Sequence, residues 1–234
     1  MSLTQAAERA ALNKLVDYLD ENPTENIDKI MDLVNRLVPD NVFPVQRQAF
    51  TDVIKSRGNW YDLMMRVFQL NSKMRTKLIK ALLIDGNLLA WPVQERAREK
   101  YKRNIPWAIL LDPTSACNLR CTGCWAAEYG HQQNLSFDDI DSIVSQGKAL
   151  GTHMYIYTGG EPMVRKKDLI RLCEAHPDCA FLCFTNATLI DEEFCQDVLR
   201  VKNFVPAISA EGSEETTDAR RGAGTYQSIV KAMK

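Results

Sequence analysis

The chain after about residue 105 alternates short apolar runs with helix-like segments. The apolar runs cover residues 105–111, 154–157, 179–184 and 204–209. Helix-start signals follow them, such as the capping-box pattern Ser-Phe-Asp-Asp at 136–139. Strands that alternate with helices form parallel sheets with right-handed crossovers. The sequence therefore predicts an α/β fold for this part of the chain, with room for about four βα units of roughly 30 residues each.

The first 95 residues carry helical periodicity instead. Apolar residues recur at the i, i+3, i+4, i+7 spacing of one buried helix face, as in Leu12, Leu15, Val16 and Leu19. We interpret residues 1–95 as an α-helical region that packs on the second region; a substrate- or partner-recognition module is the alternative. Residues 96–104 are rich in Lys and Arg, which is typical of a solvated helix face, and would connect the α-helical region to residues 105–234.

Composition excludes several classes of protein. A formal net charge of −1 gives no basic field for nucleic acid. The apolar stretches are too short for a membrane span, and the first residues do not have the pattern of a signal peptide. Seven cysteines without an export signal indicate reduced thiols or metal ligands, so we expect a cytoplasmic protein.

Three cysteines lie close together directly after the first predicted strand. Cys117, Cys121 and Cys124 have C-x3-C-x2-C spacing on one short loop. A [4Fe–4S] cluster normally takes four Cys ligands, so three would leave one iron open for another ligand. The alternative is a structural zinc site in which His131 completes a Cys3His set.

This loop, together with Thr-Gly-Gly-Glu-Pro at 158–162, resembles the radical S-adenosylmethionine (SAM) superfamily. The resemblance covers roughly residues 105–234. It implies a partial TIM-like (β/α) barrel, in which the Cys loop follows the first strand and the Gly-Gly-Glu-Pro turn ends the second. Members commonly have six strands, so about four units suggest a truncated member that belongs to a longer enzyme. A sheet of four strands would also leave an unpaired edge near residues 204–209.

The resemblance also implies which residues meet the cofactors. Cys117, Cys121 and Cys124 would ligate the cluster, and the turn would receive the ammonium of SAM, with Glu161 as the anionic partner. The residues expected to bind SAM are Gly159, Gly160, Glu161, Asn186, Ser209, Glu211 and Arg221. Some of these have simpler explanations: Gly-Gly alone can be a tight turn, and Arg220 and Arg221, adjacent in a predicted loop, can be solvated.

One position departs from the family pattern. The residue before the third cysteine is often aromatic and packs on adenine, but here it is Gly123, and the aromatic residue is Trp125. Either Trp125 takes over the stacking or later segments hold adenine. Asn118 and Arg120 are candidates for hydrogen bonds to cluster sulfurs, which would tune the cluster's potential.

Two functions from different classes follow. The first is a radical SAM enzyme that reductively cleaves SAM at a three-Cys [4Fe–4S] cluster. The resulting 5′-deoxyadenosyl radical would abstract hydrogen from a substrate that the sequence does not identify. Its partners would be SAM, an electron donor such as flavodoxin or ferredoxin, and the substrate. The second function is a non-catalytic zinc or Fe–S module for partner binding. The four other cysteines lack ligand spacing and are expected to be small buried hydrophobes.

Overall fold

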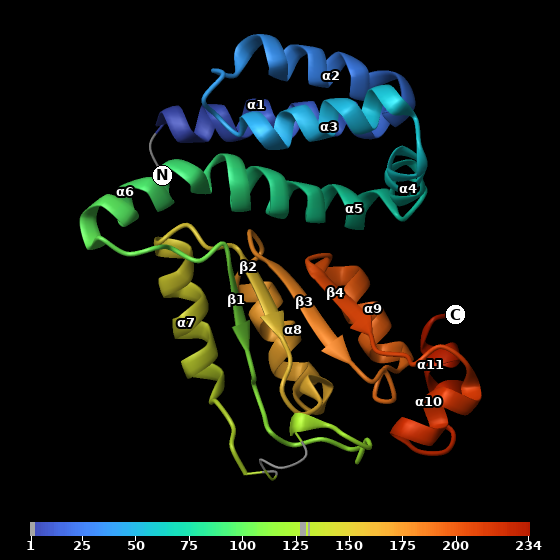
Figure 1. Cartoon of the computed structure of the whole chain (residues 1–234). Helices are drawn as coiled ribbons and strands as arrows, with labels where there is room; N and C mark the ends of the chain where they lie inside the picture. Colours follow the sequence, from blue (N-terminus) through green and yellow to red (C-terminus); the bar gives the residue numbers. More distant parts are fainter. Residues whose placement is uncertain (1–2, 127–129, 131) are drawn as a thin grey trace. The chain divides into compact units, whose positions relative to one another are not determined.

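The structure, a computed structural model, describes residues 3–126, 130 and 132–234. It contains two compact units, residues 1–80 and 81–234 (Figure 1). The division falls earlier than the connector expected at 96–104. Residues before the connector, such as Gln94, already pack in the second unit: the Gln94 side chain is buried and donates a 2.7 Å hydrogen bond to the Gly151 carbonyl oxygen. The assignment of separate roles to residues 1–95 and 105–234 stays a prediction.

The first unit is entirely helical across its described residues. It contains α1 (Leu3–Glu21), α2 (Pro23–Leu37), α3 (Pro44–Ser56), α4 (Asn59–Val67) and α5 (Ser72–Ile79). Its core forms around Ile27, Ile54 and Tyr61. Arg75 is buried and held by the Asp20 carboxylate and by two main-chain carbonyls, so its charge is paired.

The second unit is built on a parallel sheet with helices between its strands. The elements are η1 (Lys80–Leu88, a π-helix), α6 (Ala90–Tyr101), β1 (Ala108–Leu111), α7 (Phe137–Ala149), β2 (Met154–Tyr157), η3 (Pro162–Arg165), α8 (Lys166–Ala175), β3 (Ala180–Thr185), α9 (Glu192–Val201), β4 (Phe204–Ile208), α10 (Glu214–Arg221) and α11 (Thr225–Ala232). All neighbouring strands are parallel, in the order β1-β2-β3-β4. This confirms the predicted α/β class with four βα units.

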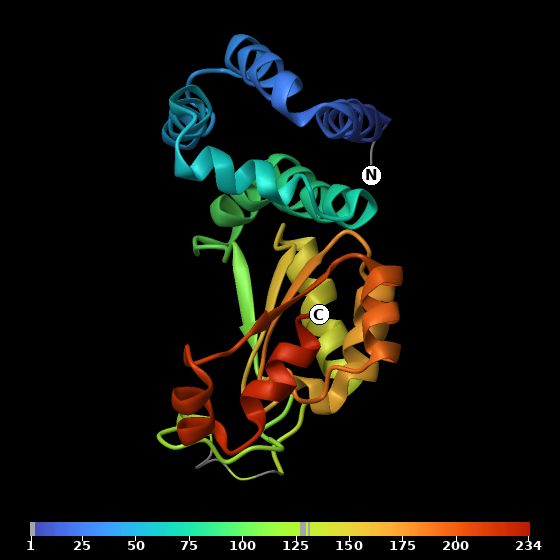
Figure 2. The same cartoon turned by 90° about the vertical axis from the view of Figure 1, so that its right-hand side faces the viewer.

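The two faces of the sheet differ in burial. Helices α7, α8 and α9 lie along one face (Figure 2). On that face Tyr155, Tyr157 and Phe181 are fully buried and their rings stack, with centroids 5.7 Å apart for each of Tyr155–Phe181 and Tyr157–Phe181. On the other face Leu110 is 60% exposed and Phe184 47% exposed. Since side chains alternate along a strand, this second face forms an open apolar surface.

None of the described helices is both long and apolar enough to cross a bilayer. Within the described residues, β1 and β4 each pair on one side only. The edge expected near residues 204–209 is therefore the outer side of β4.

Candidate functional site

The predicted site residues belong to the segments that follow the carboxyl ends of the strands (Figure 1), where ligands bind in parallel α/β sheets. Cys117, Cys121 and Cys124 all line one cavity of about 320 Å³, together with Gly160 from the segment after β2. All three are partly buried. Burial raises the thiol pKa of Cys117 and Cys121, while the Arg221 charge acts in the opposite direction on Cys121. The structure thus brings the three cysteines to one hollow.

These cysteines are not gathered around a single point. Across the described residues, no three His, Cys, Asp or Glu side chains come close enough together to hold one metal ion. His131, the fourth ligand of the zinc alternative, lies outside the described residues. A cubane needs a wider arrangement than a single ion because each of its thiolates binds a different iron.

The Gly-Gly-Glu turn continues the pairing of β1 and β2 into the Cys loop. The Gly160 amide donates to the Thr114 carbonyl oxygen at 3.0 Å, and the Glu161 amide to the Ala116 carbonyl oxygen at 2.8 Å. A Cβ atom on Gly160 would lie 2.2 Å from that Ala116 oxygen. Gly159 has φ +104°, and a Cβ there would lie 2.9 Å from Asp112. Both glycines are therefore needed for the turn to approach the Cys loop.

The Glu161 carboxylate is buried and already accepts three hydrogen bonds from the protein. One oxygen accepts from the Thr185 hydroxyl at 2.8 Å and the Met163 amide at 3.0 Å; the other accepts from the Asn186 amide at 2.7 Å. Burial raises the Glu161 pKa, and these donors only partly oppose the rise. Glu161 therefore joins the end of β2 to the end of β3. Its expected role as the partner of an ammonium stays a prediction.

Two asparagines connect the Cys loop to the end of β3. The Asn186 amide group donates to the Asn118 side-chain oxygen at 2.9 Å, and Asn118 donates to the Thr188 hydroxyl at 2.7 Å. Thr188 in turn donates to the Asn186 oxygen at 2.7 Å. This closed triangle engages one hydrogen of the Asn118 amide group and ties the Cys loop to the end of β3. The expected hydrogen bond from Asn118 to a cluster sulfur stays a prediction.

The α10 segment lies against the Cys loop. The Thr122 amide donates to the Arg220 carbonyl oxygen at 2.8 Å. Glu211 accepts hydrogen bonds from Arg220 and Arg221, each at 2.7 Å, and these pairs lower its pKa. The two arginines were expected in a loop, which is wrong: they end helix α10, whose N-cap is Ser213.

The expected SAM contacts at the end of β4 have partners within the protein. Glu211 and Arg221 bind each other, and the Ser209 amide donates to the Thr185 carbonyl oxygen at 2.9 Å. The Arg221 end of this pair lies near the Cys loop, since the Arg221 charge acts on the pKa of Cys121. Their binding to SAM stays a prediction.

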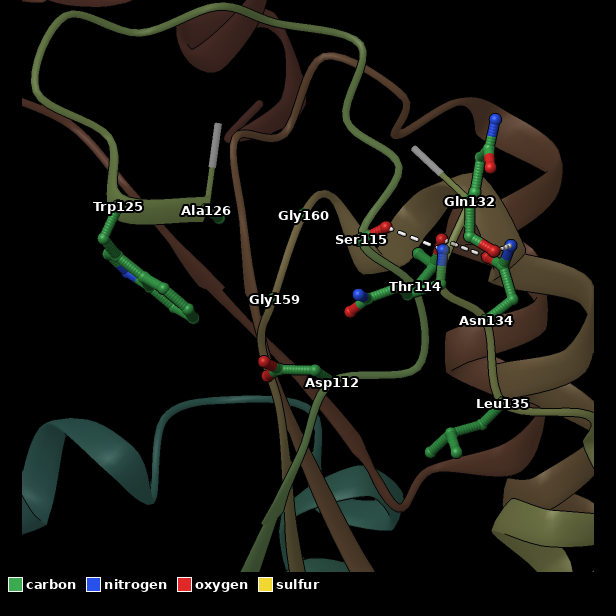
Figure 3. A pocket seen from close by; sticks show the side chains of 11 residues that line it. Asp112, Thr114, Ser115, Trp125, Ala126, Gln132, Asn134, Leu135, Gly159 and Gly160 are labelled. Atoms are coloured by element: carbon green, nitrogen blue, oxygen red, sulfur yellow. Dashed lines mark hydrogen bonds between the residues drawn. The ribbon is translucent and has the colours of Figure 1, made fainter. Parts of the chain in front are cut away.

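A second cavity of about 570 Å³ adjoins the first (Figure 3). The segment 132–135 forms one of its walls by folding back on residues 113–115: the Ser115 amide donates to the Gln133 carbonyl oxygen at 2.8 Å. Asp112 and Trp125 also line it. Asp112 was not predicted as a site residue. Strand alternation could have indicated it, because Asp112 lies two residues beyond the exposed Leu110 and therefore on the same open face of the sheet.

The cysteines outside the loop do not form a second site in the described part of the chain. Cys173, Cys179 and Cys183 are buried. Burial raises the pKa of all three thiols, to about 12 for Cys179. Cys195 is partly buried on α9. A high thiol pKa disfavours the thiolate that metals and oxidants require.

Residues 111–234 match the family model described as the radical SAM superfamily. The chain belongs to the radical SAM superfamily. The match covers more than half of its residues and includes the three cysteines, the Gly-Gly-Glu turn and the α10 arginines.

Individual relatives share about a third or less of their residues with this chain over the aligned parts. The chain is 27% identical to an Fe-coproporphyrin III synthase of Methanosarcina barkeri over 53% of this chain and 32% of the relative. It is 34% identical to a GTP 3′,8-cyclase of Pseudomonas savastanoi over 40% of this chain and 30% of the relative. The chain thus spans about a third of the length of the curated relatives it matches.

Among solved structures, SuiB of Streptococcus suis, bound to S-adenosylmethionine, aligns with a TM-score of 0.52 and 19% identity. The alignment covers 80% of this chain and 43% of SuiB. This likeness supports the fold assignment, a partial barrel of the radical SAM type.

Proposed function

We propose that this chain carries the cluster- and SAM-binding part of a radical SAM enzyme, in which Cys117, Cys121 and Cys124 ligate a [4Fe–4S] cluster. The observation that carries the proposal is that these three thiols line one cavity with Gly160, within a chain of this superfamily. When bound, the reduced cluster would supply the electron that splits SAM into methionine and a 5′-deoxyadenosyl radical.

The donor set fits such a cluster. Fe–S clusters take thiolate ligands. Burial raises the pKa of Cys121, and the nearby charge of Arg221 partly opposes that rise. The described residues that line the cavity include three cysteines of one loop and no fourth cysteine, which leaves room for a ligand of another kind. The cavity is thus consistent with SAM at the open iron.

We assign different tasks to the residues around the cavity. Gly159 and Gly160 would offer main-chain groups to SAM, because they lack side chains that would keep a ligand away. Glu161 holds this turn against β3, and its charge acts on Cys117, whose pKa it raises together with burial. This negative charge would also favour the ammonium of SAM.

The remaining expected contacts come from the ends of β3 and β4. Asn186 and Ser209 would contribute polar groups to SAM there. Arg221 would meet the SAM carboxylate, and Glu211 would either accept from the ribose hydroxyls or keep Arg221 in place, as it does in the structure. An external electron donor such as flavodoxin or ferredoxin, and a substrate that gives up hydrogen, complete the proposal.

The test measures iron, sulfide and SAM cleavage in one series of variants. The chain, reconstituted anaerobically, should hold about four iron and four sulfide and form 5′-deoxyadenosine from SAM when reduced. Cys117→Ser, Cys121→Ser and Cys124→Ser should each lose both properties. Cys195→Ser is the matched control and should keep them. Stoichiometric zinc in place of iron, or equal iron in all four variants, would contradict the proposal.

A further inference from the structure

The larger cavity, of about 570 Å³, has the size of a small-molecule site. It is distinct from the Cys cavity, although the two adjoin. Both are lined by Ser115, Ala126 and Gly160, whereas Asp112 and Trp125 line only the larger one. A molecule held there would lie beside whatever occupies the Cys cavity without replacing it.

Asp112 carries the only charge among the described residues that line this cavity. The other described lining residues are neutral: Thr114, Ser115, Trp125, Ala126, Gln132, Gln133, Asn134, Leu135, Gly159 and Gly160. With a single carboxylate and no Lys or Arg among these residues, the cavity attracts cations and repels anions.

The Asp112 carboxylate has no protein partner in the described part of the chain. No hydrogen bond or ion pair joins it to a described residue, and burial alone raises its pKa. The contrast with its neighbours is informative. The Thr114 hydroxyl donates to the Asn134 side chain, and the Ser115 hydroxyl accepts from the Gln133 amide. Asp112 thus keeps its acceptor capacity for a ligand.

Trp125 supplies an aromatic surface in the same cavity. It is 58% exposed, and Figure 3 shows its ring and the Asp112 carboxylate both projecting into the hollow. The two side chains come from opposite ends of the Cys loop. A carboxylate together with an indole ring is a combination that binds organic cations, because the ring face also attracts positive charge.

The surroundings favour a cation that is attached to an apolar body. Asp112 follows Leu110 on the open face of the sheet, where Leu110 and Phe184 are exposed. A ligand whose charge reaches Asp112 can therefore place apolar groups over this face.

We propose that this cavity binds an organic ammonium or guanidinium group of the enzyme's substrate, between the Asp112 carboxylate and the Trp125 ring. The inference rests on the proposed function, since a site beside the Cys cavity would place the substrate next to SAM. It extends that function by naming the chemical class of substrate: a cationic amine or guanidine on an apolar body.

The experiment uses the 234-residue chain labelled with 5-fluorotryptophan. The chain has four Trp, and Trp125→Phe identifies the ¹⁹F signal of Trp125. Benzylammonium is the probe; benzyl alcohol and benzoate are its neutral and anionic analogues. We expect benzylammonium to shift the Trp125 signal saturably, with a dissociation constant at least about fivefold lower than that of benzyl alcohol, or about 1 kcal/mol. Benzoate should bind more weakly still.

Asp112→Asn should weaken benzylammonium binding about fivefold and leave benzyl alcohol binding unchanged. Asp138→Asn is the matched control, because Asp138 is an exposed carboxylate on α7 outside the cavity. Equal affinities for benzylammonium and benzyl alcohol in the wild-type chain would overturn the proposal, whether or not the Asp112 variant folds. So would an unchanged benzylammonium affinity in a folded Asp112→Asn chain.

A second arm separates the substrate from SAM, which also carries an ammonium. Asp112→Asn should leave the SAM-induced change in the cluster's EPR signal intact. Loss of that change would assign Asp112 to SAM and overturn the substrate assignment. Because the ¹⁹F titration needs neither cluster nor SAM, its failure is distinguishable from failure of the proposed function.

Discussion

Replacing Gly160 with Ala should disconnect the Gly-Gly-Glu turn from the Cys loop. The added methyl carbon would lie 2.2 Å from the Ala116 carbonyl oxygen and 2.7 Å from the Ser115 carbonyl carbon. Normal contacts between such atoms are about 3.5 Å, and both neighbours are main-chain atoms that no rotamer change can move. The turn must therefore shift by about 1 Å or the loop must move with it.

The cost follows from the contacts that such a shift breaks. The amides of Gly160 and Glu161 each donate one hydrogen bond to the loop, at 3.0 and 2.8 Å. Losing both at about 1 kcal/mol each, with an added overpacking cost of about 1–3 kcal/mol, lowers the free energy of unfolding by about 3–5 kcal/mol. The displaced loop should also retain less iron after reconstitution.

Urea unfolding followed by circular dichroism measures this loss. Two compact units need not unfold in one step. Hydrogen exchange of the peptide that contains Gly160 therefore shows whether the stability loss belongs to the second unit. Gly58→Ala is the control, because the nearest atom to its added methyl carbon is 3.8 Å away. A Gly160→Ala chain whose free energy of unfolding is within about 0.5 kcal/mol of wild type, with unchanged hydrogen exchange and iron content, would show that the turn does not need a glycine at position 160.

Three further predictions concern the polar contacts. Glu161→Gln should lower the free energy of unfolding by about 1–3 kcal/mol. Both carboxylate oxygens of Glu161 accept from N–H or O–H donors, so the NH₂ group of the glutamine must face one of these donors. Urea unfolding measures this loss, with Glu193→Gln at an exposed position as the control. Asp218 accepts from two amides at the start of α11, which lower its pKa. The ordinary pKa of an Asp carboxyl is 3.8, so the stabilisation from Asp218 is fully present above pH 3.8 and is lost as the pH falls through the lower pKa of the folded state. A ¹³C NMR titration of Asp218 in the folded chain with a midpoint at or above 3.8 would contradict this prediction. Asn118→Ala and Asn186→Ala should be coupled by about 1 kcal/mol in a double-mutant cycle, whereas additive effects would mean that their hydrogen bond contributes nothing.

Much of the fold could be predicted because each strand is a contiguous apolar run. The run at 154–157 is β2 without change, and the capping box at Ser136 is present with both of its hydrogen bonds. Helix α10 was not predicted because its sequence, Glu-Glu-Thr-Thr-Asp-Ala-Arg-Arg, has no apolar face whose period could reveal it. The helix begins at the N-cap residue Ser213, whose hydroxyl accepts a hydrogen bond from the Thr216 amide.

The surroundings of the site residues could be predicted less well. The spacing of the cysteines indicates a shared loop, but the acceptor role of Glu161 toward Thr185 and Asn186 depends on a partner strand more than 20 residues later. The cavity at Asp112 likewise forms only because residues 132–135 fold back on 113–115. Contacts of this kind follow from tertiary packing and leave no periodic signal in the sequence.

We propose that Cys117, Cys121 and Cys124 hold a cluster with one iron open to SAM. EPR of the anaerobically reconstituted and reduced chain, recorded before and after addition of SAM, tests this directly. We expect a [4Fe–4S]⁺ signal that changes shape when SAM is added. A cluster signal that stays the same with saturating SAM, or no cluster signal from a folded chain, would contradict it.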